Sequence, residues 1–367
     1  MPRLVLAAVS GGDRRLVFVF LRGGMDGLAS VPATGDPGFE ALRGEHAGEA
    51  LKLDATFGLS PHLVQMHGLY GAGELAVLHA VASPYRERSH FDAQNLLENG
   101  TVRPYGRDSG WLNAALVAQG TDGGVALGQS IPLVLRGQAT VTSWSPSKLP
   151  EPDPDLLARL AALYQGDSLL ERPFAAARES QNMMDDVAGS RDAGAGAQAV
   201  VALAQAAGEF LGRRTGPRVA SLDFGGWDSH INQVGEYSPL TRNLKLLDRA
   251  MAALKGSLGE AWRHTAVLVV TEFGRTVALN GSHGTDHGTA TAAFVAGGAV
   301  RGGRVIAEWP GLADRDLYQG RDLRPTFDLR ALFKAALVAQ LGLGEAALET
   351  QVFPGSGDVK PLEGLFA

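Results

Sequence analysis

The sequence predicts an α/β protein with a mostly parallel central sheet flanked by helices. Five short runs rich in Val, Leu and Ala are bounded by glycine or polar residues, which is typical of strands buried on both faces of a parallel sheet. Helical patterns of apolar residues lie between several of these runs. Glycine is frequent, at 48 of 367 residues, and its clustering at the ends of the runs indicates tight turns between strands and loops.

The expected elements follow in chain order. The strands are predicted at 16–21, 75–81, 219–224, 266–271 and 292–296. One helix is predicted at 63–70, directly before the second strand. A longer helix is predicted at 240–258, where apolar residues recur at helical spacing: Leu244, Leu247, Met251 and Leu254. Because helices alternate with strands, this order is typical of repeated βα units.

The middle third of the chain predicts helices without strands. Apolar residues from Leu156 to Leu163 and over 199–211 recur at helical spacing. Between them, SRDAGAGAQ at 190–198 is too poor in large apolar residues to bury a core, so we expect an exposed and mobile connection there. No linker long enough to separate two domains occurs. We therefore expect a single domain over 1–367 with a helical insert at 151–213.

Composition narrows the possible chemistry. The chain has no cysteine, which excludes thiolate metal sites, cysteine nucleophiles and disulfides. Its net charge of -6 offers no basic surface for nucleic acid, and no stretch reaches the ~20 apolar residues of a membrane-spanning helix. We expect a small-molecule partner and a cytoplasmic location for the chain as it stands, because residues 4–9 make a poor signal-peptide core. The oligomeric state cannot be predicted from these features.

Acidic and imidazole side chains cluster in sequence next to the expected strands. Four glycine-rich motifs carry them: RGGMDG (Asp26), GGWDSH (Asp228 and His230), TEFGRT (Glu272 and Arg275) and GSHGTDHG (His283 and His287). In open α/β sheets, ligands bind beyond the carboxyl ends of the strands. One acidic residue in a glycine-rich turn is ordinary turn chemistry, but four such motifs supply the oxygen and imidazole ligands that Zn, Mn or Mg ions prefer. Together they predict a divalent metal site.

The order of the motifs GGMDG, RSHFDAQ, GGWDSH, TEFGRT and GTDHG resembles a bacterial family of unknown function in the alkaline phosphatase and sulfatase superfamily. The resemblance spans the chain from about Leu16 to Leu341. It implies an alkaline phosphatase-like fold, one or two divalent metal ions, and hydrolysis or transfer of a phosphate or sulfate ester. Members are often exported by the twin-arginine route, so it also implies a periplasmic or exported location if an upstream signal has been lost.

The resemblance assigns roles to residues motif by motif. Asp228, His230 and His287 match the ligands of one metal ion, while Asp26 and Glu272 match ligands of a second ion. These roles come from the superfamily pattern and not from the spacing of the residues. They imply that the carboxylates of Asp26 and Glu272 both face a metal ion.

One position departs from the superfamily pattern. Superfamily phosphatases commonly have an Asp-His pair where this sequence has Glu272-Phe273, so the second metal position lacks a ligand. His90, or less favourably His283, would fill the gap, or else the protein binds a single metal ion. The resemblance also implies a nucleophile after the first helix, for which Ser89 in RSHFDAQ is the candidate.

Two arginines are candidates for binding an anionic substrate. Arg88 or Arg275 can hold a phosphate-like group through two parallel hydrogen bonds, although Arg275 is equally well placed in sequence to pair with Glu272. Because sulfatases of this superfamily use a formylglycine made from Cys or Ser and the chain has no cysteine, a phosphoester is the favoured substrate. The alternative is a non-catalytic metal-containing binding or assembly protein on the same fold.

Two further hypotheses can be judged from the sequence. RGGMDG matches neither the dinucleotide-binding nor the P-loop glycine pattern, which argues against a nucleotide-binding protein. His79 lies inside the second expected strand, so we predict a hydrogen-bonded core histidine and not a metal ligand.

Overall fold

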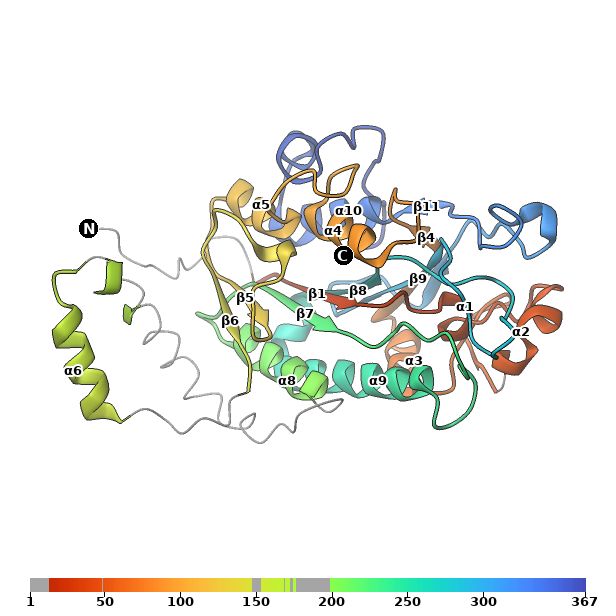
Figure 1. Ribbon diagram of the computed structural model, residues 1–367, viewed down its shortest axis with the longest axis horizontal. Helices are drawn as coiled ribbons and strands as arrows, with labels where there is room; N and C mark the ends of the chain where they lie inside the picture. Colours follow the sequence, from red (N-terminus) through yellow and green to blue (C-terminus); the bar gives the residue numbers. More distant parts are fainter. Residues whose placement is uncertain (1–12, 48, 147–152, 168, 172–173, 176–198) are drawn as a thin grey trace.

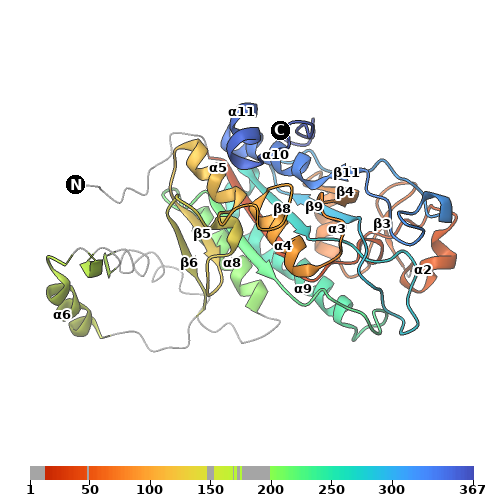
Figure 2. The same ribbon diagram turned by 45° about the horizontal axis from the view of Figure 1, so that its top comes forward.

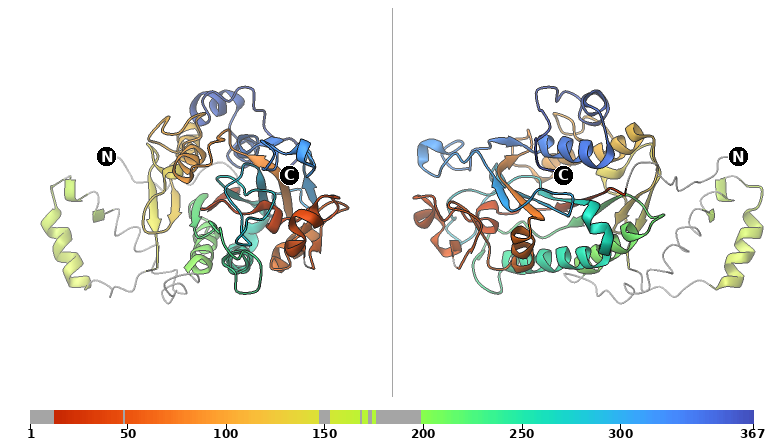
Figure 3. Two further views of the ribbon diagram at one scale, coloured as in Figure 1. Left: turned by 45° about the vertical axis from the view of Figure 1, so that its right-hand side comes forward. Right: turned by 180° about the vertical axis from the view of Figure 1, so that it is seen from behind.

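A central sheet lies between two layers of helices in the computed structural model (Figure 1). The structure describes residues 13–47, 49–146, 153–167, 169–171, 174–175 and 199–367. The sheet is mostly parallel, as the sequence predicts, and helices cover both of its faces in every view (Figures 2 and 3). The predicted connection at 190–198 lies outside the described residues.

The main sheet has the strand order β10-β4-β9-β8-β1-β7-β5-β6, and β11 also pairs with β4. Its strands are β1 (Arg15–Leu21), β4 (Leu75–Ala82), β5 (Gly124–Leu127), β6 (Val141–Trp144), β7 (Val219–Phe224), β8 (Thr265–Thr271), β9 (Thr291–Ala296), β10 (Arg304–Ile306) and β11 (Phe327–Asp328). Strands β2 (Leu51–Lys52) and β3 (Gly58–Leu59) form a separate antiparallel pair. All five strands predicted from the sequence are present.

One strand of the main sheet runs against the others. β1 pairs in parallel with both β7 and β8, whereas β9 is antiparallel to its neighbours β4 and β8. The amino end of β9 therefore lies at the same edge of the sheet as the carboxyl ends of β1, β7 and β8. The motif GSHGTDHG, which precedes β9, consequently reaches the edge at which the other three motifs follow their strands.

The structure has helices on both faces of the sheet and one helix, at Pro154–Tyr164, that lies apart from it (Figure 1). They are α1 (Gly27–Ser30), α2 (Phe39–Ala47), α3 (Val64–Gly71), α4 (His90–Asn99), α5 (Trp111–Gln119), α6 (Pro154–Tyr164), α8 (Ala199–Gly212), α9 (Pro239–Leu258), α10 (Leu329–Leu341) and α11 (Glu345–Ala347). Short 3₁₀ helices are η1 (Leu133–Leu135), η2 (Gly259–His264) and η3 (Asp314–Asp316). A short π-helix is η4 (Leu348–Val352). Among the described residues, none of the helices combines the length and apolar character that crossing a membrane requires.

Side chains of β1 alternate between two hydrophobic cores, as expected for a strand buried on both faces. Val17, Val19 and Leu21 pack with residues of α3, α8 and α9. Leu16, Phe18 and Phe20 face the opposite way and pack with residues of α4, α5 and α10. This double burial explains why an uninterrupted apolar run, and not an alternating one, marks the strand in the sequence.

Both helices predicted in the middle third are present. α8 packs on α9 and β7, whereas α6 lies apart from the sheet (Figure 1). Leu156 and Leu163 of α6, expected on an apolar face, are 48% and 74% exposed. The single-domain organisation and the extent of the insert at 151–213 stay predictions.

His79 lies in a bulge of β4 and is completely buried. Its Nε2 lies 3.0 Å from the carbonyl oxygen of Val31, and its Nδ1 accepts a hydrogen bond from the backbone N–H of Ala80. Ala80 has a φ of 57°. His79 is therefore a hydrogen-bonded core histidine, which confirms the prediction.

Candidate metal centre

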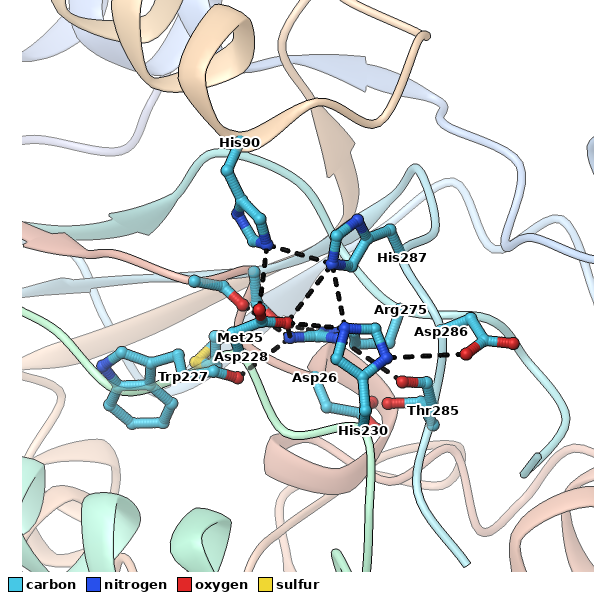
Figure 4. Close-up of polar contacts among 12 residues, drawn as sticks. Met25, Asp26, His90, Trp227, Asp228, His230, Arg275, Thr285, Asp286 and His287 are labelled. Atoms are coloured by element: carbon cyan, nitrogen blue, oxygen red, sulfur yellow. Dashed lines mark hydrogen bonds and ion pairs between the residues drawn. The ribbon is translucent and has the colours of Figure 1, made fainter. Parts of the chain in front are cut away.

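Four loops meet at the edge of the sheet formed by the carboxyl ends of β1, β7 and β8. Asp228 and His230 follow β7, and His287 comes from the loop before β9. His90 is the first residue of α4 and points toward the same place from the helical layer (Figure 4). Side chains that are far apart in sequence are thus brought together, as the strand-end argument predicts.

Close backbone contacts fix the positions of these loops relative to one another. Gly23 has a φ of 122°, and a Cβ there would lie 2.5 Å from the backbone nitrogen of Asp228. A Cβ on Gly284 would lie 2.1 Å from the carbonyl oxygen of His230. Only glycine allows such contacts, so the glycine-rich motifs position the loops that carry Asp228 and His230 as well as turning the chain.

Three imidazole nitrogens and one carboxylate converge in this cluster. The Nε2 atom of His287 lies 3.0 Å from Nε2 of His90, 3.1 Å from Nε2 of His230 and 3.2 Å from Oδ1 of Asp228. His230 Nε2 lies 2.9 Å from Asp228 Oδ1, and His90 Nε2 lies 3.5 Å from Asp228 Oδ2. These four side chains are between 21% and 44% exposed, so the cluster is open to solvent on one side.

The other nitrogen of each histidine faces a group that can only accept a hydrogen bond. Nδ1 of His90 lies 2.7 Å from Oε1 of Glu272, Nδ1 of His287 lies 3.1 Å from the carbonyl oxygen of Arg88, and Nδ1 of His230 lies 3.5 Å from Oδ1 of Asp286. A proton on each Nδ1 satisfies these acceptors, and in the neutral imidazole this leaves a lone pair on Nε2. The three lone pairs therefore point into one cluster.

The cluster fits a divalent metal ion. Nε2 of His287 lies about 3 Å from Nε2 of both His90 and His230, and lone pairs on atoms this close repel unless a cation lies between them. A metal-binding histidine also typically donates its other N–H to a carboxylate or carbonyl. In a tetrahedral zinc site with bonds of about 2.0–2.1 Å, ligand atoms lie roughly 3.3 Å apart, close to the spacing found here. Atoms of His90, Asp228 and His287 meet the distance requirement for a shared ion.

Neighbouring groups keep the carboxylates of Asp228 and Glu272 ionised. Burial alone would raise the pKa of Asp228, but the hydrogen bond and positive charge of Arg275 outweigh it and lower the pKa to about 2. Burial is likewise outweighed at Glu272, where hydrogen bonds from His90 and Gln94 lower the pKa of the carboxyl. Asp228 is therefore available as an anionic ligand at neutral pH.

The family of the chain follows from a sequence comparison. Residues 69–352 match the model of a family described as protein of unknown function (DUF1501). The chain belongs to this family. A search of curated proteins found no significant match. The match covers the region of the motifs RSHFDAQ, GGWDSH, TEFGRT and GTDHG, whereas Asp26 lies before it.

Solved structures similar to this DUF1501 protein include a sulfatase, a periplasmic domain and a lipoteichoic acid synthase. A 2-O GAG sulfatase is 10% identical with a TM-score of 0.43, covering 95% of this chain and 73% of that chain. The C-terminal periplasmic domain of EcEptC from Escherichia coli is 10% identical with a TM-score of 0.41, covering 96% and 88%. The lipoteichoic acid synthase LtaP from Listeria monocytogenes is 9% identical with a TM-score of 0.39, covering 94% and 76%.

Asp26 does not join the cluster of imidazoles. It caps the amino end of α1, where Oδ1 accepts from the backbone N–H of Ala29, and it is 2% exposed. Oδ2 accepts hydrogen bonds from Arg43 at 2.8 Å and from Gln233 at 2.6 Å. The structure thus gives Asp26 a buried ion pair, and its role as a metal ligand stays a prediction.

Glu272 touches the cluster through His90. It is 1% exposed, and its Oε1 accepts from the backbone N–H of Gly23 at 2.9 Å and from the Gln94 amide at 2.8 Å in addition to His90. Phe273 packs its ring against the ring of His90, with centroids 4.7 Å apart. Glu272 therefore accepts a hydrogen bond that orients His90, and its role as a metal ligand stays a prediction.

Arg275 has different partners from those expected. It does not pair with Glu272 in the structure, because its Nη2 donates to Asp228 Oδ1 at 2.7 Å. Its other hydrogen bonds go to the carbonyl oxygens of Gly24, Gly23, Trp227 and Thr285. The guanidinium therefore ties three loops together. With a side chain only 1% exposed, it presents no open face to a substrate, and its catalytic role stays a prediction.

Ser89 lies next to the cluster, directly before His90 at the amino end of α4, and its side chain does not cap the helix. The hydroxyl of Tyr85, from the same loop, donates to Oδ2 of Asp92 at 3.1 Å. Arg88, which has a φ of 60°, donates through Nε to Oδ2 of Asp322 at 2.8 Å. The guanidinium of Arg88 is thus already paired, and the assignment of Ser89 as nucleophile stays a prediction.

Sequence reasoning missed two residues that shape the site. Gln94 lies four residues after His90 on α4, and its amide bridges Glu272 and Arg22. Its helical spacing from His90 was a usable signal, because residues four apart share a helix face. Arg43 gave no such signal, since it lies in α2 outside every motif.

Proposed function

We propose that this protein is a metal-dependent hydrolase or transferase acting on a phosphate or sulfate ester, with a phosphoester favoured because the chain lacks cysteine. One observation carries the proposal. Nε2 of His287 lies 3.0–3.2 Å from Nε2 of His90, Nε2 of His230 and Oδ1 of the ionised Asp228 carboxylate, while each Nδ1 faces an acceptor. Such a pre-arranged set of ligands matches Zn, Mn or Mg, with nitrogen donors favouring Zn.

The side chains of the site have separate tasks. A divalent ion supplies positive charge against the oxygens of the ester. Asp228, held by Arg275, stays ionised and fixed in direction. Ser89 is the candidate nucleophile. It stands at the amino end of α4, where the helix dipole favours an approaching anion and a developing alkoxide.

The pairing of the arginines supports an ion as the principal anion-binding group. Arg88 is committed to Asp322, and Arg275 to Asp228 and backbone oxygens. A substrate phosphate therefore meets no unpaired guanidinium from either of these two residues. Recognition of the substrate falls mainly to the ion and to the amino end of α4.

A non-catalytic metal-containing binding protein is the second candidate. It is favoured by Phe273, whose apolar ring stands where superfamily phosphatases commonly have a histidine. Such a protein would hold the metal ion yet turn over no ester. The resemblance implies a periplasmic or exported location. The proposed enzymatic activity does not depend on that location.

The test measures metal content and ester turnover together. The purified protein is loaded with Zn, Mn or Mg and assayed on an aryl phosphate, a phosphodiester and an aryl sulfate. His287→Ala should lose both metal and turnover, whereas His264→Ala, an exposed histidine before β8 at the opposite edge, should keep both. Metal retained without turnover would favour the binding protein, and turnover unchanged in His287→Ala would refute the site.

A further inference from the structure

We propose that this protein binds one metal ion, held by His90, Asp228, His230 and His287, and that the guanidinium of Arg43 replaces a second ion. The inference rests on the metal site of the proposed function and deepens it. It addresses the position that the superfamily pattern assigns to Asp26 and Glu272. Neither carboxylate has an oxygen in the His90–Asp228–His287 cluster.

The hydrogen-bonding capacity of Asp26 is already used. Oδ1 accepts from the N–H of Ala29 at 3.1 Å and from Arg43 Nη2 at 3.4 Å, while Oδ2 accepts from Arg43 Nη1 at 2.8 Å and Gln233 at 2.6 Å. Gln233 is itself fixed, because its Oε1 accepts from the Thr285 hydroxyl at 2.7 Å. A metal ion could bind Asp26 only by displacing these donors from a site that is 2% exposed.

Arg43 is built into this position. Its side chain is fully buried, and α2 departs from helical geometry at Arg43 itself, with φ -145° and ψ 17°. The guanidinium also donates to the carbonyl oxygens of Val277 and Thr276, in the loop after β8. A fixed cation beside Asp26 compensates the carboxylate charge and repels a second positive ion at short range.

Glu272 is equally committed. Its Oε1 takes three donors, from Gly23, His90 and Gln94, and the Thr271 hydroxyl lies 2.9 Å from Oε2. Phe273 places an apolar ring next to it, against His90. The second position therefore offers an arginine and an apolar ring where a second ion would need open ligands.

The test counts ions by a measurement that does not depend on turnover. The protein is titrated with Mn²⁺ and examined by elemental analysis and electron paramagnetic resonance. We expect saturation at one ion per chain and the resolved hyperfine spectrum of an isolated Mn²⁺. Saturation at two ions with an exchange-coupled spectrum would overturn the inference while leaving the proposed metal site intact. Failure to bind any ion would overturn both.

Two variants test whether Arg43 takes the place of a second metal ion. Asp26→Asn removes the carboxylate, and under our proposal the count stays at one ion with affinity changed by less than about threefold. In a two-ion protein, the same variant would lose an ion. Because Asp26→Asn weakens a buried ion pair and can destabilise the fold, Arg43→Lys is a second variant that keeps the positive charge. It should also bind one ion, and binding of two ions by it would contradict the assignment.

Discussion

Replacing Glu272 by glutamine tests whether a buried carboxylate orients a metal-binding histidine. Glutamine keeps the shape of the side chain and an oxygen for His90 Nδ1, now 2.7 Å from Glu272 Oε1. The change converts a charge-assisted hydrogen bond of about 1.5–3 kcal/mol into a neutral one of about 0.5–1.5 kcal/mol. A loss of about 1–1.5 kcal/mol corresponds to metal binding that is roughly 10-fold weaker. This agrees with the ~10–100-fold effects of losing such orienting groups elsewhere.

The assay is a competition titration with a chromophoric zinc chelator at fixed pH, which reports affinity and stoichiometry together. We expect Glu272→Gln to bind one ion about 10-fold more weakly. Glu74→Gln is the matched control, because Glu74 forms a surface ion pair with Lys255 before β4, at the opposite edge of the sheet. Unchanged affinity in Glu272→Gln would refute the orienting role. Loss of the ion from a folded protein would show that Glu272 is a ligand.

Three further predictions concern the groups that hold the site and the core. Gly23→Ala should weaken metal binding at least 10-fold, because its Cβ would lie 2.5 Å from the Asp228 nitrogen; Gly73→Ala, with φ 74° and open space around it, should leave the affinity unchanged in the same titration. Arg275→Met should lower the free energy of unfolding in urea by about 3 kcal/mol, since it leaves Asp228 and several carbonyl oxygens without their donor. His79 has its pKa lowered by burial from 6.5 to about 4, so the folded state resists protonation that the unfolded chain accepts. Stability should be full above pH 6.5 and fall by about 3 kcal/mol between pH 6.5 and pH 4, and His79→Gln should remove most of that slope in unfolding curves.

The strands that could be predicted are those buried on both faces. β1, β4, β7, β8 and β9 are completely or almost completely buried, so packing alone requires continuous apolar runs. β5 and β6 have four residues each, and β6 is partly exposed at the edge, so neither leaves a distinctive pattern. The direction of β9 could not be predicted, because burial sets which residues a strand contains and not which way it runs.

The convergence of the motifs could be predicted for a physical reason. Loops after neighbouring parallel strands must lie at one edge of the sheet, which places the loops after β1, β7 and β8 side by side. GTDHG comes before its strand and reaches the same edge only because β9 is antiparallel. His287 therefore lies 3.2 Å from Asp228 through a geometry that the sequence argument did not contain.

The different surroundings of the acidic residues could be found only from the three-dimensional structure. Asp26, Asp228 and Glu272 all stand in glycine-rich loops next to strands, and nothing in their local sequence separates them. What separates them is the number of donors that reach each carboxylate. Arg43 saturates Asp26 from a helix outside every motif, and three donors saturate one oxygen of Glu272. Arg275 donates to Oδ1 of Asp228, the oxygen that also lies close to Nε2 of His287 and His230. Oδ2 of Asp228 faces Nε2 of His90 at 3.5 Å. A carboxylate in such a cluster is available to a cation only where the surrounding chain leaves it short of hydrogen-bond donors, so ligand roles should be assigned from donor counts and not from motif position.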